Sequence, residues 1–450
     1  MRIVVETALN RGAAEYLNLG DVSMLQVAVR RLQRLWPSAS ISVLTDSGDG
    51  LKRYCPGAKP LSRTGRDRWI GDSFAFGGLH KYLPRKAASA LRTATDALER
   101  NLPRFLRALV GLRLRVRDSE HIRGDVAEFL GAMEGADLFV VCGAGGFTDS
   151  CREWNLTTLG TLETALRRHI PVAMFGQGMG PLSDAHVLSR AKDVLPAVGL
   201  ITLRGGRGGQ ALAESLGVAP SRAQITGDEA VELAYEARPA KVGHALGVNL
   251  RVASYADVNE DVCDRLRPVL QDFARGRDAP MLPVPIAFHA HASDHLAIRR
   301  ILAGYDDQSD GGLSLDTPLK VIEQVGRCRV VVTGAYHAAV FSLAQGIPVV
   351  CLAGSADYMA KFLGLQDLFG QGCETLLLDD PMFTRKLEAA LENAWRTAEE
   401  VRLPLQRAAA RQIELSWHAY ERVRHLVDWS RHPELKMSTG AMNPSLRITG

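Results

Sequence analysis

One histidine stands where a ligand could be held and a proton transferred. The run Arg329–Thr333 is apolar and β-branched, which is typical of a buried parallel strand. Gly334 makes a tight exit, and a helix is predicted to begin at His337 and to end at Gly346. His337 is therefore expected at the carboxyl end of a strand, where open α/β sheets bind ligands, and at a helix N-terminus, which attracts anions. This position favours contact with an anionic ligand, and the alternative is a histidine that only caps or packs the helix.

Glycines and arginines follow other predicted strands. The candidate loop residues are Gly143, Gly145, Gly146, Gly178, Gly180, Arg204 and Arg207. Backbone N–H groups of glycine-rich turns can approach a ligand closely, and guanidinium groups bind carboxylate and phosphate in a bidentate way. The loops match neither the dinucleotide fingerprint nor the P-loop, so nicotinamide and ATP are disfavoured. Each loop is also compatible with ordinary turn chemistry, and Arg204 with a structural ion pair.

The elements that must position these residues alternate between strands and helices. Strands are predicted at Ile3–Glu6, Ser40–Thr45, Leu138–Cys142, Val172–Phe175, Leu200–Leu203, Gln224–Thr226, Ala245–Asn249, Met281–Phe288, Arg329–Thr333 and Val349–Leu352. Helical patterns separate most of them, which predicts doubly wound parallel sheets. We expect an α/β fold with one Rossmann-like domain at 1–235 and a second at 245–378, which carries the donor site. The two domains are expected to face each other across a cleft.

Three segments fall outside this alternation. The segment 84–117 is rich in arginine with interleaved leucines, and predicts a basic helical insertion. This insertion could contact an anionic membrane surface, or could lie beside the cleft with a solvated basic face. The segment 380–430 predicts C-terminal helices that are broken near Pro404. The polar tail 432–450 is expected to be disordered.

Composition excludes several classes of protein. A chain of 450 residues is too long for one ordinary core. The net charge of +4 is too small to imply nucleic acid, and the seven cysteines are scattered, with neither zinc-site spacing nor a disulfide framework. No His/Asp cluster suggests another metal. No apolar run is long enough for a membrane span, and Met1 begins a predicted strand instead of a signal peptide. We therefore expect a cytoplasmic protein without a metal.

Taken in order, the segments resemble the polysaccharide pyruvyl transferase family. The resemblance runs from about residue 3 to 370 and rests on Asn18–Asp21, Gly143–Asp149, Gly176–Leu182, Leu203–Arg204, Thr226–Ala230, Gly247–Arg251, Tyr336–His337, Gly346–Pro348 and Lys361–Leu365. It implies two domains similar to those of GT-B glycosyltransferases. It also implies transfer of the enolpyruvyl carbons of phosphoenolpyruvate to two hydroxyls of a sugar or glycan acceptor, which gives a cyclic ketal and needs no cofactor.

The resemblance also implies roles for single residues. His337 matches the family's catalytic histidine, and Arg204 matches an arginine of the donor site. Asp21, expected to be a helix N-cap, or Asp149 could be the base toward the sugar hydroxyl. A helix N-terminus disfavours a charged imidazole, and a dianionic donor would offset this. The remaining donor-site candidates are Arg207, Arg251, Gly334, Tyr336, Gly178, Gly180 and Lys361.

The chain departs from the family pattern at two positions. Ala335 stands where many relatives carry an arginine, and Gly205 stands where an acidic residue is common. Arg207 or Arg251 could replace the missing positive charge. Two other functions remain open from the sequence. The protein could be a GT-B glycosyltransferase that uses a nucleotide sugar, or a glycan- or phosphate-binding descendant without catalysis.

Overall fold

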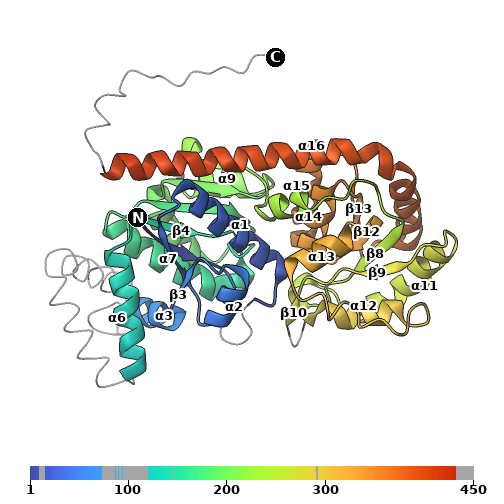
Figure 1. The fold of residues 1–450 in the computed structure, drawn as a ribbon, viewed down its shortest axis with the longest axis horizontal. Coiled ribbons are helices and arrows are strands. Elements are labelled where there is room, and N and C mark those ends of the chain that lie inside the picture. Colours follow the sequence, from blue (N-terminus) through green and yellow to red (C-terminus); the bar gives the residue numbers. More distant parts are fainter. Residues whose placement is uncertain are drawn as a thin grey trace, which may run out of the picture.

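The structure is a computed structural model that describes residues 1–9, 16–72, 87, 90, 94, 120–143, 145–289 and 292–431. Within these residues, two parallel β-sheets form two domains that lie side by side (Figure 1). The tail 432–450 and nearly all of the segment 84–117 lie outside the described residues. The hypotheses of a basic helical insertion and a disordered tail therefore stay predictions.

The N-terminal sheet has seven parallel strands in the order β3-β2-β1-β4-β5-β6-β7. The strands are β1 (Arg2–Glu6), β2 (Ser40–Leu44), β3 (Lys59–Leu61), β4 (Leu138–Val141), β5 (Val172–Gln177), β6 (Leu200–Leu203) and β7 (Ala223–Ile225). The central strands β4, β5 and β6 are buried along their whole length, which explains their continuous apolar sequences. The helices are α1 (Leu19–Leu35), α2 (Gly48–Tyr54), α3 (Arg63–Asp72), α6 (Glu120–Glu134), α7 (Arg152–Arg167), α8 (Ala185–Val194), α9 (Gly209–Ser215) and α10 (Ala230–Glu236).

The C-terminal sheet has five parallel strands in the order β14-β13-β12-β8-β9. These are β8 (Ala245–Asn249), β9 (Met281–Pro283), β12 (Cys328–Thr333), β13 (Val349–Ala353) and β14 (Cys373–Leu377). A short hairpin pairs β10 (Phe288–His289) with β11 (Ala292–Ser293). The helices are α11 (Asp261–Arg275), α12 (Asp294–Leu302), α13 (Pro318–Val325), α14 (Tyr336–Gln345) and α15 (Ala356–Phe369). The two sheets confirm the predicted fold class.

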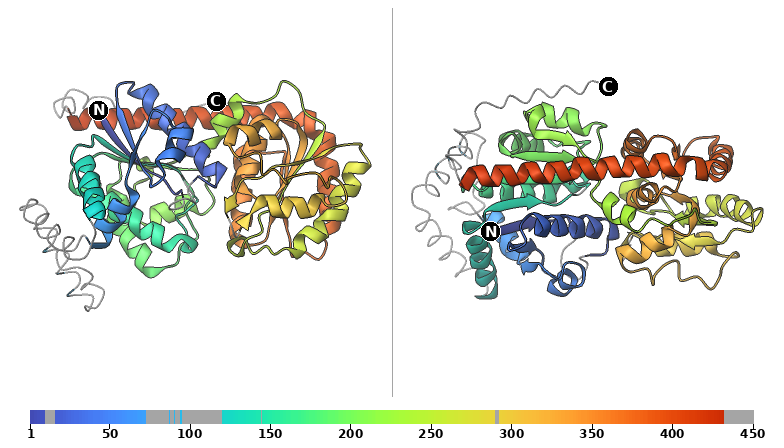
Figure 2. Two further views of the ribbon diagram at one scale, coloured as in Figure 1. Left: turned by 60° about the horizontal axis from the view of Figure 1, so that its bottom comes forward. Right: turned by 45° about the horizontal axis from the view of Figure 1, so that its top comes forward.

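One long helix, α16 (Phe383–Arg431), runs beside both domains (Figure 2). Its first part lies along the C-terminal sheet, and the helix then bends and crosses back over the N-terminal domain (Figure 1). The prediction of separate helices broken at Pro404 is wrong, because Pro404 lies inside the continuous helix. Proline removes one backbone hydrogen bond and bends a helix without always ending it. Among the described helices, none is both long enough and apolar enough to cross a bilayer.

The two domains are joined directly at the N-terminus of α1. The backbone N–H of Leu19 donates to the carbonyl of Ile286 at 2.9 Å, and the N–H of Phe288 donates to the carbonyl of Leu17 at 2.9 Å. One cluster of buried apolar side chains continues from α1 through α10, α14 and α16 into the C-terminal sheet. These contacts fix the start of α1 against the C-terminal domain, which determines what faces His337.

Candidate active site

The carboxyl ends of both sheets border one cavity of about 360 Å³ between the domains. The N-terminal domain contributes loops that follow β1, β4 and β6, and the C-terminal domain contributes loops that follow β8, β9 and β12 together with α15. The lining residues are Ala8, Asn18, Asp21, Gly145, Gly146, Ser150, Cys151, Arg204, Arg251, Tyr255, Ile286, His289, Ala335, Tyr336, His337, Tyr358 and Lys361. Open α/β sheets bind ligands at this edge, so the cavity is the candidate active site.

His337 lies in the first turn of α14 and packs against the first turn of α1. A Cβ atom added to Gly20 would lie 2.0 Å from Cγ and from Nδ1 of the His337 ring. Only glycine leaves room for the imidazole at this point, which gives a physical reason for the glycine in the Asn18–Asp21 segment. The side chain of His337 is 7% exposed, and its ring still lines the cavity.

Asp228 brings a buried carboxylate to the same point. Its Oδ2 atom lies 3.6 Å from Nε2 of His337 and 3.6 Å from a guanidinium nitrogen of Arg204. Its Oδ1 atom accepts a hydrogen bond from the backbone N–H of Ala230 at 2.9 Å. Burial by itself would raise the pKa of this carboxyl, but the neighbouring His337 and Arg204 outweigh it and lower the pKa of Asp228. The carboxylate is therefore held in its charged form beside the histidine.

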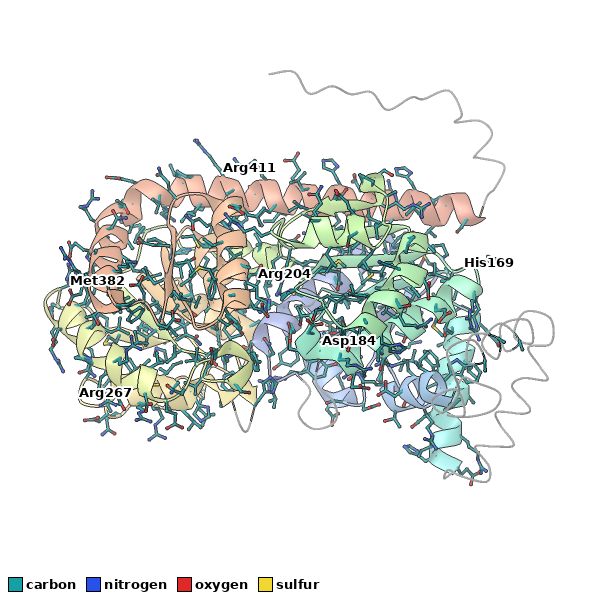
Figure 3. All side chains as sticks on the ribbon, turned by 180° about the vertical axis from the view of Figure 1, so that it is seen from behind. His169, Asp184, Arg204, Arg267, Met382 and Arg411 are labelled. Atoms are coloured by element: carbon teal, nitrogen blue, oxygen red, sulfur yellow. The ribbon has the colours of Figure 1, made fainter. Side chains whose placement is uncertain are left out.

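Arg204 follows β6 and lies where the two domains meet (Figure 3). Its guanidinium stacks on the face of the Tyr336 ring, 4.1 Å from the ring centroid. Cβ atoms added to Gly145 or Gly178 would come within 2.2 and 2.7 Å of the guanidinium nitrogens, so glycine backbone borders it on other sides. Within the described residues, its side chain makes one long ion pair to Asp228 and no hydrogen bond. Its donors remain available to an anion in the cavity.

Lys361 adds a second cation beside Arg204. Both residues also line a smaller cavity of about 50 Å³, which is bordered by the glycines Gly145, Gly178, Gly180, Gly205 and Gly364. Burial and the charge of Arg204 lower the pKa of Lys361 to about 8. Its ammonium lies 4.8 Å from the centroid of the Tyr358 ring, and no carboxylate in the described part of the chain lies within ion-pair distance of it. Arg204, whose one ion pair to Asp228 is 3.6 Å long, and Lys361 together form a site for an anion with two negative charges.

Asp21 lies in the first turn of α1 and lines the cavity. The prediction that it caps this helix is wrong, because Asn18 is the N-cap and accepts hydrogen bonds from the backbone N–H groups of Gly20 and Asp21. The Asp21 carboxylate therefore does not cap the helix and lines the cavity instead. Burial raises its pKa, against the opposing charges of His337 and Arg204. A carboxyl with a raised pKa is a stronger base at neutral pH than an ordinary aspartate.

The C-terminal wall of the cavity contains Arg251, which is already paired. Asp294 binds its guanidinium through two hydrogen bonds of 2.6 and 3.0 Å, and the Tyr255 hydroxyl accepts a third at 2.9 Å. The Tyr255 ring is 50% exposed and stacks on Tyr358, with centroids 6.5 Å apart. Because Asp294 neutralises Arg251, this arginine is a poorer replacement for the charge missing at Ala335 than Lys361 is.

Several predicted residues lie elsewhere. The Asp149 carboxylate accepts hydrogen bonds from the backbone N–H groups of Ser183 and Asp184, so it stabilises a loop and does not line the cavity. The prediction that Asp149 is the base toward the sugar hydroxyl is therefore corrected: this carboxylate lies outside the cavity. Arg207 borders the smaller cavity, but its guanidinium pairs with Asp367 of α15 at 2.8 Å.

Two predicted glycines serve packing. A Cβ atom added to Gly143 would meet Met24 at 2.1 Å, and one added to Gly334 would meet the backbone nitrogen of Arg251 at 3.1 Å. Neither glycine borders the cavity. Both allow close approach of neighbouring elements, which is a structural use of glycine.

The sequence reasoning missed several residues of the site. These are Asp228, Ser150, Cys151, Tyr255, His289 and Tyr358. Asp228 belongs to the Thr226–Ala230 segment, so its position after a predicted strand was a usable signal. Burial and the nearby Arg251 lower the pKa of His289, which favours its neutral form. Within the described residues, no group of three or more His, Cys, Asp or Glu side chains is arranged to hold a metal ion.

The two domains with parallel sheets and the cavity between them form an arrangement of the GT-B-like type. The family model of polysaccharide pyruvyl transferases matches residues 18–355, and the chain belongs to this family. No curated protein matches the chain.

Several solved structures are similar to this chain at low sequence identity. A protein assigned as a UDP-N-acetylglucosamine 2-epimerase from Listeria monocytogenes is 8% identical, with 97% of each chain covered and a TM-score of 0.51. HepE from Anabaena, solved with UDP, is 10% identical over 95% of this chain and 99% of its own, with a TM-score of 0.49. A UDP-GlcNAc 2-epimerase from Methanocaldococcus jannaschii is 11% identical over 95% of this chain and 100% of its own, also with a TM-score of 0.49.

Proposed function

We propose that the protein transfers the enolpyruvyl group of phosphoenolpyruvate to two hydroxyls of a sugar, in a polysaccharide or in a lipid-linked or nucleotide-linked glycan precursor. The observation that carries this proposal is that two neighbouring cations, Arg204 and Lys361, line one cavity with His337 and Asp21. Within the described residues, the only ion pair of these two cations is the one from Arg204 to Asp228 at 3.6 Å. Family membership supports the reaction class. The donor and the ketal chemistry are what membership of this family implies, and the charges of the site fit them.

Phosphoenolpyruvate has the charge pattern that this site fits. It carries a phosphate and a carboxylate on the same carbon, and both groups can accept hydrogen bonds from guanidinium and ammonium donors. Arg204 presents a planar fork of donors, and Lys361 presents a more compact charge close to it. The glycine backbone at Gly145 and Gly178 lets the phosphate approach the guanidinium without meeting side chains.

The reaction needs one acid and one base. His337 would donate a proton to the terminal methylene carbon of phosphoenolpyruvate, which makes the adjacent carbon an oxocarbenium-like electrophile. A first sugar hydroxyl would form a C–O bond to that carbon and give its proton to Asp21. The C–O bond to phosphate then breaks with its electron pair, phosphate leaves, and a second hydroxyl closes the ketal. The proton of the second hydroxyl goes to the departing phosphate, and the proton held by Asp21 returns to His337, which restores both the acid and the base. Each proton transfer is worth about 10² to 10⁴-fold. The step needs no cofactor.

The experiment that tests this proposal follows both possible donors in one reaction. The protein is incubated with phosphoenolpyruvate and a panel of hexopyranosides and nucleotide sugars, while phosphate release and product mass are recorded. Release of phosphate with formation of a pyruvyl ketal is the expected result. Loss of a nucleotide sugar without loss of phosphoenolpyruvate would instead identify a glycosyltransferase. Binding of phosphoenolpyruvate without turnover of any acceptor would favour the non-catalytic alternative, and His337→Ala distinguishes an active site from contamination.

The basic segment 84–117 gives a hypothesis about the acceptor. If the acceptor is lipid-linked, its arginines would hold a cytoplasmic protein at an anionic membrane surface. Replacing several of these arginines should then reduce binding to phosphatidylglycerol-containing liposomes at low salt. Unchanged liposome binding would remove the membrane hypothesis and leave the donor chemistry untouched.

A further inference from the structure

Two opposing electrostatic effects act on His337, the acid of the proposed reaction. His337 lies in the first turn of α14, where the helix dipole disfavours a charged imidazole. The carboxylate of Asp228 lies 3.6 Å from Nε2 of the same ring and favours the charged form. Asp228 therefore places a negative charge beside the ring even without a bound donor. From the sequence alone, only a bound donor was expected to bring negative charge to His337.

The two nitrogens of the His337 ring are not equivalent. Nε2 is buried, and so is the facing Oδ2 atom of Asp228; neither atom has a hydrogen-bond partner among the residues that the structure describes. Nδ1 lies on the ring edge that packs against Gly20, in the first turn of α1 where Asp21 faces the cavity. A separation of 3.6 Å is longer than a hydrogen bond, and a shift of about half an ångström would close it.

We propose that Asp228 is the positioning residue of His337: it accepts a hydrogen bond from Nε2–H, and so makes Nδ1 the nitrogen that exchanges protons with the substrate. This inference rests on the proposed function for its catalytic meaning. Its structural part, the bond between the carboxylate and Nε2–H, holds whatever the substrate is. A carboxylate that fixes the tautomer of a catalytic histidine and stabilises its charged form is a recurring arrangement in enzymes.

Asp228 also acts on the donor site, because the same Oδ2 atom lies 3.6 Å from Arg204. Its negative charge reduces the attraction of Arg204 for an anion. Removing the charge should therefore strengthen anion binding while it slows turnover. A residue that only supports the loop would weaken both when it is replaced.

The first test is ¹⁵N NMR of protein labelled at histidine, with inorganic phosphate as the anion and His337→Gln to assign the signals. We expect a downfield Nε2–H proton of His337 that exchanges slowly with water, and its loss in Asp228→Ala. Glu229→Gln is the matched control, because this neighbouring buried carboxylate faces Tyr420 and not His337. Absence of the proton in the wild-type protein, or its persistence in Asp228→Ala, overturns the inference.

The second test separates positioning from structure. Asp228→Asn should lower the turnover of phosphoenolpyruvate about 10²-fold while the Kd for phosphoenolpyruvate stays equal or falls. A rise in Kd together with the loss of turnover would show a merely structural role and overturn the inference. If the wild-type protein turns over no phosphoenolpyruvate, the proposed function fails, and the NMR result still decides the role of Asp228.

Discussion

Replacing Gly20 with alanine tests the contact on which the candidate site depends. The added Cβ atom would lie 2.0 Å from Cγ and Nδ1 of His337, whereas ordinary contact begins at 3.4 Å. The ring or the start of α1 would have to move by about 1.4 Å, the difference between these two distances. The start of α1 is held by the hydrogen bond from Leu19 to Ile286, so we expect the ring to move.

The magnitude follows from two opposing effects. Alanine inside a helix is favoured over glycine by up to about 1 kcal/mol. Overpacking of a tightly packed contact costs about 1 to 3 kcal/mol. The net expectation for Gly20→Ala is a decrease in the free energy of unfolding of about 1 to 2 kcal/mol. Displacing the imidazole by more than 1 Å should also lower turnover by about 10²-fold.

The assay is a double-mutant cycle measured by urea unfolding. In the His337→Ala background the clash is gone, so Gly20→Ala should be neutral or should stabilise the protein by up to about 1 kcal/mol. Gly131→Ala is the matched control, because a Cβ atom there meets nothing within 4 Å and the position is also helical. An equal effect of Gly20→Ala in both backgrounds would refute the packing of His337 against α1.

Three further predictions concern charge. Lys361 loses its proton above about pH 8, so the affinity for phosphoenolpyruvate should fall as pH rises above this value. Calorimetry should show that Lys361→Arg removes this fall in affinity. An unchanged fall in affinity would contradict the assignment of Lys361 to the donor site. Burial raises the pKa of Glu229 from 4.5 to about 7. The contribution of Glu229 to stability is therefore fully present below pH 4.5 and is lost as pH rises to about 7. Glu229→Gln should therefore gain stability relative to the wild type over this interval in thermal unfolding scans, and a constant difference would argue against it. Asp149→Asn should lower the unfolding temperature and leave phosphoenolpyruvate binding intact; weakened binding would return Asp149 to the site.

The strands of the core could be predicted because their signal is local. Val330–Val332 and Val349–Leu352 are apolar runs with a clear start and end, and the structure confirms both strands. The predicted strand Met281–Phe288 is only partly right, because it ends as β9 at Pro283 and resumes as β10. Proline cannot donate a ladder hydrogen bond, which explains the interruption. Strands β3 and β14 were missed, because β3 is short with two exposed residues and the exposed Glu374 interrupts the buried pattern of β14.

The site could be predicted only where the position after a strand was sufficient. Arg204 follows β6 and borders the cavity as expected. Arg207 stands three residues later, but Asp367 of the other domain binds it. The role of Asp228 depends on α14 packing against the N-terminal domain, a contact between residues far apart in the sequence. Partners of this kind come from tertiary packing, which a single sequence does not encode locally.

The most direct test of the central claim is a calorimetric titration of phosphoenolpyruvate into the wild-type protein and into Arg204→Ala. Arg53→Ala is the control, because Arg53 is an exposed arginine that pairs with Asp316 and borders neither cavity. The account predicts saturable binding to the wild type and the control, and a loss of at least about tenfold in affinity in Arg204→Ala, since charge-assisted hydrogen bonds contribute about 1.5 to 3 kcal/mol each. Undiminished binding to Arg204→Ala, or binding of a UDP-sugar with none of phosphoenolpyruvate, would contradict it.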